Sequence, residues 1–103
     1  MSEGLFWDLA REMHGADPNV AEGTIMGSRC LRVGAEFLAM SDHRSGALVV
    51  KLPRNRVAAL IEQGIGEAFA PAGRVFKEWV SISEPDETLW RSLLAEGKAF
   101  VAG

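Results

Sequence analysis

Apolar residues along this chain follow two spacings, which predict helices in some segments and strands in others. Residues 2–13 carry an apolar side chain at nearly every fourth position, as one face of an amphipathic helix requires. Ser2 is suited to cap this helix, and Gly15 is predicted to end it at the turn-forming residues 15–19. The apolar positions of the helix are Leu5, Phe6, Leu9 and Met13.

From residue 24 the pattern changes to short apolar runs separated by glycine, which is typical of strands joined by turns. Gly34-Ala35 has the length of a tight hairpin turn, and residues 41–46 are predicted to form a longer polar loop. Residues 47–52 are apolar on both faces, as in a central strand that is covered on both sides or lies at a dimer interface. The predicted strands cover residues 24–26, 29–33, 36–40, 47–52 and 77–83.

Two more helices are predicted, one after the fourth strand and one near the C-terminus. Pro53 suits the first turn of the middle helix, and residues 64–73 after it are predicted to be a loop. Ser83 is predicted to cap the last helix with Asp86 in its first turn, and Gly97 is expected to interrupt and weaken it. The order of helix, four strands, helix, strand and helix predicts an α+β fold, in which amphipathic helices cover an antiparallel meander.

Length and composition predict a single domain over residues 1–103. The chain is 48% hydrophobic and 24% charged, which is ordinary globular usage. Its apolar runs are too short to span a bilayer, and the first residues lack a basic region followed by an apolar stretch. We therefore expect a cytoplasmic protein without membrane association.

The residues best able to carry chemistry lack the neighbours that chemistry needs. Neither His14 nor His43 has a second histidine or a carboxylate at metal-ligand spacing. Cys30 is the single cysteine, which excludes an internal disulfide, and it lies in a predicted strand where a thiol usually packs as a small apolar group. The Gly64-Ile65-Gly66 stretch lacks the third glycine of a nucleotide-binding turn. The sequence therefore predicts no catalytic residue, metal site or cofactor, and a protein that is not an enzyme.

Charge is distributed unevenly along the chain. Residues 29–77 carry eight basic and four acidic side chains between two acidic ends, although the whole chain has a net charge of −3. Part of this basic middle surrounds a predicted helix N-terminus, and part lies beside aromatic residues before the last strand, where it could bind phosphate or stack bases. The alternative is ordinary packing of the aromatic rings beneath solvated charges. The candidate binding residues are Lys51, Arg54, Arg56, Arg74, Lys77 and Trp79.

Three short motifs spread over nearly the whole chain carry a family resemblance. They are Gly23-Thr24-Ile25-Met26-Gly27 running into Leu31-Arg32-Val33, Leu48-Val49-Val50-Lys51-Leu52-Pro53, and Gly73-Arg74 followed by Lys77-Glu78-Trp79-Val80. Together they resemble the YjbR-like proteins and the amino-terminal domain of the TfoX-like proteins, although Ile25-Met26-Gly27 stands where that family has a Met-Phe-Gly-like turn. The resemblance implies a bacterial protein with an α+β fold similar to the type III secretion chaperones, in a family with few assigned activities.

Two functions are the main candidates at this point, and a third, enzymatic one rests on Cys30 alone. The first is a non-enzymatic interaction domain that binds another protein, or a second copy of itself as a homodimer, through the sheet or the groove beside it. The second is a nucleic-acid-binding module that uses the basic and aromatic surface between Lys51 and Trp79, because members of the family are often labelled DNA-binding. A sequence pI near 5.3 argues against strong nonspecific DNA binding, which normally needs a basic domain.

Overall fold

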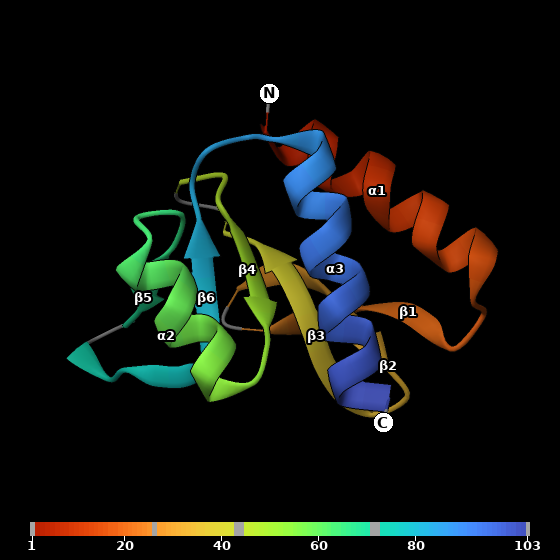
Figure 1. Ribbon diagram of the computed structural model, residues 1–103. Helices are drawn as coiled ribbons and strands as arrows, with labels where there is room; N and C mark the ends of the chain where they lie inside the picture. The colour runs from red at the N-terminus through yellow and green to blue at the C-terminus, as the bar shows by residue number, and fades with distance from the viewer. Residues whose placement is uncertain (1, 26, 43–44, 71–72, 103) are drawn as a thin grey trace.

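The computed structural model describes residues 2–25, 27–42, 45–70 and 73–102 (Figure 1). They form a six-stranded antiparallel sheet and three helices, which confirms the predicted α+β class and the helices at the N-terminus, in the middle and at the C-terminus. The strand order across the sheet is β1-β2-β3-β4-β6-β5. In chain order the elements are α1 (Ser2–Ala16), β1 (Val20–Ile25), β2 (Ser28–Val33), β3 (Glu36–Ser41), β4 (Leu48–Lys51), α2 (Arg54–Glu62), β5 (Glu67–Phe69), β6 (Phe76–Ile82) and α3 (Glu87–Ala102).

The helices and one face of the sheet share a large hydrophobic core. In Figure 1, α3 crosses β3 and β4 with α1 beside it, and α2 lies over β5 and β6. Each helix contributes fully or nearly fully buried side chains, as amphipathic helices do when they cover a sheet. Representative members of this helix-side core are Phe6, Leu9, Leu38, Leu48, Val50, Leu60, Val80, Trp90 and Leu94.

The opposite face of the sheet carries a second, smaller hydrophobic cluster. Cys30, Met40 and Val49 are almost completely buried there, together with Phe69. The half-buried rings of Phe37, Phe76 and Trp79 and the side chain of Ile25 pack against them. We call this set the aromatic-side core.

Strand β4 has apolar residues on both faces, as predicted for a central strand. Leu48 and Val50 belong to the helix-side core, whereas Val49 between them belongs to the aromatic-side core. On β6, Val80 also joins the helix-side core and Trp79 the aromatic-side core, in agreement with the predicted alternation of a strand.

The structure corrects the predicted strands at both edges of the sheet. β1 begins at Val20 rather than residue 24, and β5 lies within residues 64–73, which were predicted to be a loop. Both errors have one cause. Each edge strand has one buried residue, Val20 in β1 and Phe69 in β5, so neither shows the alternation of buried and exposed positions that identifies a strand. These two segments form strands because β1 pairs with β2 and β5 pairs with β6, and such pairing cannot be recognised from the local sequence.

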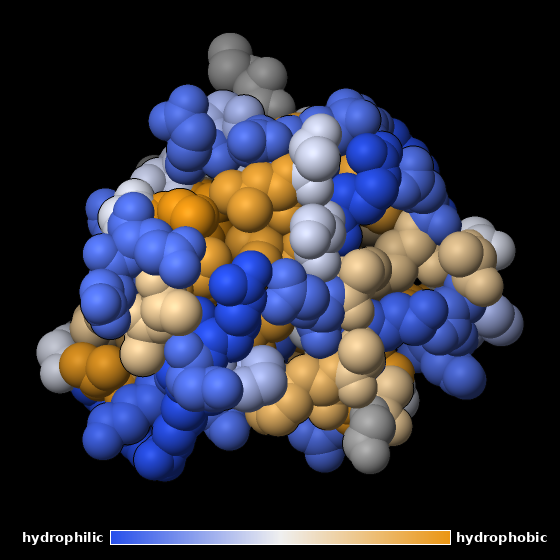
Figure 2. Space-filling model, in the orientation of Figure 1, coloured by the Kyte–Doolittle hydropathy of each residue, from blue (hydrophilic) through white to orange (hydrophobic). Residues whose placement is uncertain are grey.

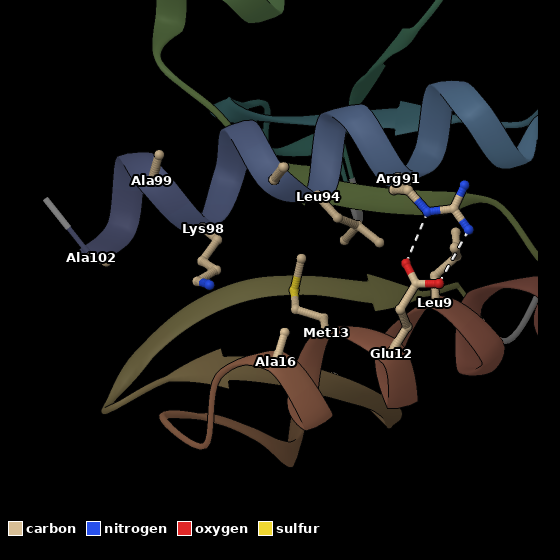
Figure 3. Close-up of a pocket in the computed structure, with 10 residues that line it drawn as sticks. Leu9, Glu12, Met13, Ala16, Arg91, Leu94, Lys98, Ala99 and Ala102 are labelled. Carbon is tan, nitrogen blue, oxygen red and sulfur yellow. Dashed lines mark hydrogen bonds and ion pairs between the residues drawn. The ribbon is translucent and has the colours of Figure 1, made fainter.

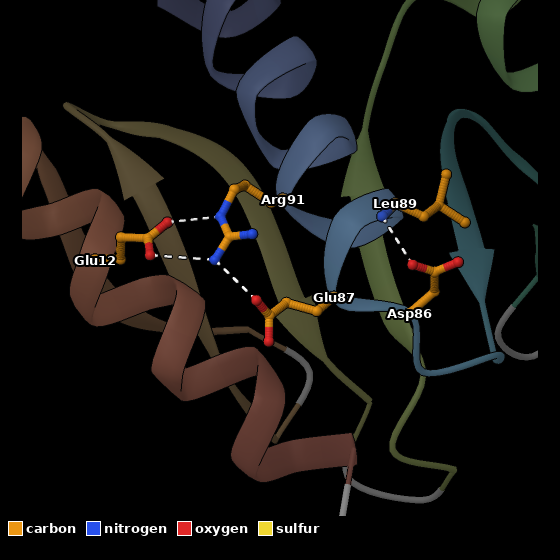
Figure 4. Close-up of polar contacts among 5 residues, drawn as sticks. All are labelled: Glu12, Asp86, Glu87, Leu89 and Arg91. Carbon is orange, nitrogen blue, oxygen red and sulfur yellow. Dashed lines mark hydrogen bonds and ion pairs between the residues drawn. The ribbon is translucent and has the colours of Figure 1, made fainter.

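The structure also moves two helix boundaries. α1 continues through Gly15 to Ala16, and Asp17, which precedes a proline, is the first residue outside it. α3 begins at Glu87, and its cap is Asp86 rather than Ser83. The Asp86 carboxylate accepts a hydrogen bond of 3.0 Å from the backbone N–H of Leu89 (Figure 4). Since Glu84 precedes Pro85, helical geometry is disfavoured there and the helix starts later.

Gly97 does not interrupt the last helix. α3 runs unbroken from Glu87 to Ala102, and Gly97 is buried at the place where the helix crosses the sheet. A Cβ atom there would lie 2.9 Å from the carbonyl oxygen of Lys51 and 2.9 Å from Cγ2 of Val50. The glycine therefore permits close contact between α3 and β4, and tertiary packing outweighs its low helix propensity.

Candidate functional site

Five of the six predicted binding residues line one surface hollow. Lys51 is the last residue of β4, Arg54 is the first of α2, and Arg74 and Lys77 flank the beginning of β6. Trp79 follows on β6. The hollow has a volume of about 350 Å³ and is completed by Val75, Phe76 and Glu78. We call it the cationic hollow.

Strand pairing brings these residues together from two distant parts of the sequence. β4 and β6 are antiparallel neighbours, and their register places Lys51 opposite Trp79. Beyond that pair, the backbone N–H of Leu52 donates a 2.8 Å hydrogen bond to the carbonyl oxygen of Glu78. α2 starts at Arg54, which therefore lies beside the residues that lead into β6.

The structure separates Arg56 from the cationic hollow. Its guanidinium forms two hydrogen bonds with the carboxylate of Glu96 on α3, with N···O distances of 2.9 and 3.2 Å. At 3.6 residues per turn, Arg56 points roughly 200° away from Arg54 around α2. The prediction placed both arginines on one surface because it used their proximity in sequence, but helical geometry directs Arg56 toward α3.

The four cations of the hollow have no carboxylate partner among the described residues. By contrast, ion pairs are formed elsewhere by Arg11, Arg29, Arg56, Arg91 and Lys98. The guanidinium of Arg74 lies 5.5 Å from the centroid of the Phe76 ring, and among the described lining residues Glu78 is the one acidic side chain. Several like charges around one concave surface create a positive potential, which favours an anionic ligand.

Trp79 is a packed member of the aromatic-side core. Its ring stacks on Phe37 with a centroid distance of 4.1 Å and an interplanar angle of 19°. It also stacks on Phe76 at 4.8 Å and lies 5.4 Å from Phe69. Because phenyl rings already stack on the indole, the main contribution of Trp79 is to hold the start of β6 in place through the aromatic-side core.

An apolar pocket adjoins the cationic hollow, and the sequence did not reveal it. It has a volume of about 270 Å³ and lies between α2 and the segment that leads into β6. Figure 2 shows apolar surface beside hydrophilic surface at this end of the molecule. We call it the α2–β6 pocket; its lining residues are Arg54, Val57, Ala58, Ile61, Ala68, Val75, Phe76, Lys77 and Trp79.

The α2–β6 pocket was missed because Ile61 fits the apolar stripe of α2. The structure buries Val57 and Leu60 in the helix-side core, but it leaves Ile61 39% exposed. Val75 is 54% exposed, and together with Ile61 it gives the pocket exposed apolar surface. An aliphatic residue at position 75 between two cations is the sequence signal that could have indicated this surface.

A different hollow of about 410 Å³ lies between the C-terminal half of α1 and the part of α3 from Arg91 to Ala102 (Figure 3). Its apolar lining includes Leu9, Met13 and Leu94. The charged residues that line it form ion pairs: Glu12 with Arg91 at 2.8 Å, and Lys98 with Asp17, the residue after α1, at 3.0 Å. Arg91 also contacts Glu87 one turn earlier on α3 (Figure 4). These pairs join the two helices and leave few polar groups to orient a ligand.

We expect the same pairs to make the contact between α1 and α3 sensitive to acid. Hydrogen bonds from Arg91, followed by its positive charge, lower the pKa of Glu12 below its ordinary value. The backbone N–H of Asn19 and then the ammonium of Lys98 lower the pKa of Asp17. A carboxylate whose pKa is lower in the folded than in the unfolded state stabilises the fold at pH values above its ordinary pKa. This stabilisation is lost as the pH falls through the folded-state pKa.

We therefore expect the free energy of unfolding to decrease below about pH 4.5, where carboxylates of unfolded chains begin to take up protons. Urea denaturation between neutral pH and pH 3 measures this slope for the native chain and for Glu12→Gln with Asp17→Asn. The double variant should lose less stability over that interval than the native chain. An equal loss in both would show that these carboxylates do not contribute to the acid sensitivity.

The other candidates from the sequence lie apart from the cationic hollow and the α2–β6 pocket, or outside the described residues. Cys30 is fully buried in the aromatic-side core, as predicted for a packed thiol. His14 lies near the end of α1 with its side chain outside the described part of the structure, and His43 is itself outside the described residues. Within the described ranges, His, Cys, Asp and Glu do not form a group of three that could hold a metal ion.

Comparison of the chain with protein-family models, with curated proteins and with solved structures found no match. The resemblance to the YjbR-like and TfoX-like proteins therefore stays a prediction. In the part of the chain that the structure describes, no helix combines the length and apolar character needed to cross a bilayer.

Proposed function

We propose that this chain is a non-enzymatic interaction domain that binds a protein partner through the cationic hollow and the α2–β6 pocket. One observation carries the proposal: four cations without ion-pair partners among the described residues lie beside the exposed apolar side chains of Ile61 and Val75. Charged residues that only maintain solubility need no apolar pocket between them. An apolar centre with charged groups at its edge is the usual anatomy of a protein-binding surface.

The chemistry of the surface supports binding more than catalysis. Its charged groups are Lys51, Arg54, Arg74, Lys77 and Glu78. Among the residues described, the lining has no serine, cysteine or threonine beside a base, which covalent catalysis uses. The buried thiol of Cys30 lies in the aromatic-side core rather than in either hollow.

Nucleic-acid binding is the second candidate, and the same four cations favour it because they could contact phosphates. Two observations count against it. The stacking of Trp79 on Phe37 and Phe76 reduces the ring surface that bases could use. The net charge of −3 also means that a long polyanion would meet acidic surface beyond the hollow. Membership of the YjbR-like family, a cytoplasmic location and self-association as a homodimer are further proposals from the sequence.

Site-specific photo-crosslinking in the source cell tests the proposed function. A photoreactive amino acid replaces Val75 at the rim of the pocket, and a matched control replaces Ser92 on the exposed side of α3. We expect discrete protein adducts from position 75, which disappear in the Arg54→Glu, Lys77→Glu background, and none of these adducts from position 92. Adducts to nucleic acid at position 75 would support the second candidate instead. Equal adducts from both positions, or adducts unaffected by the charge reversal, would contradict the proposed surface.

A further inference from the structure

The cationic hollow and the α2–β6 pocket adjoin each other, because five residues line both. Arg54 from α2 and Lys77 from the beginning of β6 line both, as do Val75, Phe76 and Trp79. A ligand that extends from one hollow into the other therefore remains beside the same two cations. The pair of hollows is suited to a ligand with an apolar part and an anionic part next to each other.

The α2–β6 pocket is suited to an aliphatic side chain. Its volume of about 270 Å³ exceeds the roughly 150 Å³ of a buried apolar cavity that accommodates benzene. Val57, Ala58, Ile61 and Ala68 provide aliphatic walls, and the cations Arg54 and Lys77 lie at the rim. A leucine, isoleucine or methionine side chain would bury apolar area there, whereas the hydroxyl groups of a sugar would find few polar partners among the described walls.

The cationic hollow is suited to carboxylates. Its four cations and Glu78 give it a net charge of +3, so the rest of the chain carries −6 within the total of −3. This distribution attracts a short acidic segment that stays within the hollow and repels a long polyanion that extends beyond it. α2 also begins at this place without a side-chain cap or an acidic residue in its first turn among the described residues, so its N-terminal dipole adds to the positive potential.

On the basis of the proposed function, we infer that the partner presents an acidic peptide segment that contains an aliphatic residue. The aliphatic side chain enters the α2–β6 pocket, and neighbouring Asp or Glu side chains pair with Lys51, Arg54, Arg74 and Lys77. The apolar contact supplies buried area, and the ion pairs at the rim supply selectivity and a fast association rate. Binding should therefore weaken as the salt concentration rises.

Selection from a random peptide library displayed on phage tests this inference with the full chain as bait. We expect the enriched peptides to contain Leu, Ile, Val or Met flanked by Asp or Glu. For a synthetic copy of an enriched peptide, fluorescence anisotropy should show at least about tenfold weaker binding to Arg54→Glu with Lys77→Glu, a factor that corresponds to about 1.4 kcal/mol. Ala58→Phe, which fills the pocket without changing the charge, should weaken binding and remove the preference for an aliphatic residue.

The matched control is Arg11→Glu with Arg29→Glu, which makes the same change in net charge on exposed arginines of α1 and β2. Circular dichroism checks whether every variant is folded. Enrichment of neutral or basic peptides, equal weakening by the control, or no enrichment over the Arg54→Glu, Lys77→Glu bait would overturn the inference. If protein adducts at position 75 persist after such a result, the interaction surface stands and the inferred partner chemistry is wrong. Tighter binding of a labelled oligodeoxynucleotide than of any selected peptide would favour the nucleic-acid alternative.

Discussion

Replacing Gly97 with alanine is expected to destabilise the protein, although alanine is the better helix former. The new methyl group would lie 2.9 Å from the Lys51 carbonyl oxygen, 2.9 Å from Val50 Cγ2 and 3.0 Å from Leu38 Cδ1. One of these contacts is with backbone, so the whole helix must move to relieve it. We expect a loss of about 1–3 kcal/mol in the free energy of unfolding, which is typical of an overpacked core. Urea denaturation followed by circular dichroism measures it.

Gly4→Ala is the matched control for this experiment. Gly4 lies in α1, and a Cβ atom there would have no neighbour within 4 Å. The control should leave stability unchanged or increase it by up to about 1 kcal/mol, because alanine lowers the entropy of the unfolded chain. If Gly97→Ala were stabilising by a similar amount, α3 would not approach β4 as closely as the structure shows.

Replacing Trp79 with alanine is expected to weaken both the fold and the binding surface. The substitution removes stacking on three phenyl rings in the aromatic-side core. We expect a loss of about 3 kcal/mol, near the lower end for a large aromatic residue because the indole is half-buried. This is a substantial part of the roughly 5–15 kcal/mol that stabilises a domain. Chemical denaturation and peptide binding at a temperature where the variant stays folded measure the two effects.

Trp79→Phe separates ring stacking from the size of the indole. A phenyl ring can retain the stacked contact with Phe37, so this variant should lose less stability than Trp79→Ala and keep the selected peptide bound. If both variants bound the peptide like the native chain, Trp79 would have no part in positioning the start of β6. Equal stability of the native chain and Trp79→Ala would contradict its place in the aromatic-side core.

The sequence was sufficient to predict the elements whose burial follows a regular period. The one-sided stripe of α1 and the two apolar faces of β4 were recognised from local pattern, and both are present in the structure. The edge strand β5 was missed because Phe69 is its one buried residue. At Gly97, local propensity indicated a break, but close packing against Lys51 and Val50 determines the observed helix.

The candidate site shows the same division between local and tertiary information. Residue type indicated which side chains could bind an anion, and strand pairing then brought Lys51 and Lys77 into one hollow. Arg56 met the same criterion of residue type, yet its partner Glu96 lies forty positions later in the chain and could not be paired with it from local pattern. The α2–β6 pocket depends on the approach of two segments, so its volume was not visible in either segment alone.

Strand β4 separates two hydrophobic clusters that differ in composition, so the two clusters can accept amino-acid substitutions separately during evolution. Val49 belongs to the aromatic-side core, whereas its neighbour Val50 packs beneath α3. A substitution on one face is therefore absorbed by one cluster and leaves side-chain packing on the other face largely intact. Related chains could diverge in the surface around Trp79, and so in the partner that they recognise, while retaining the same arrangement of helices.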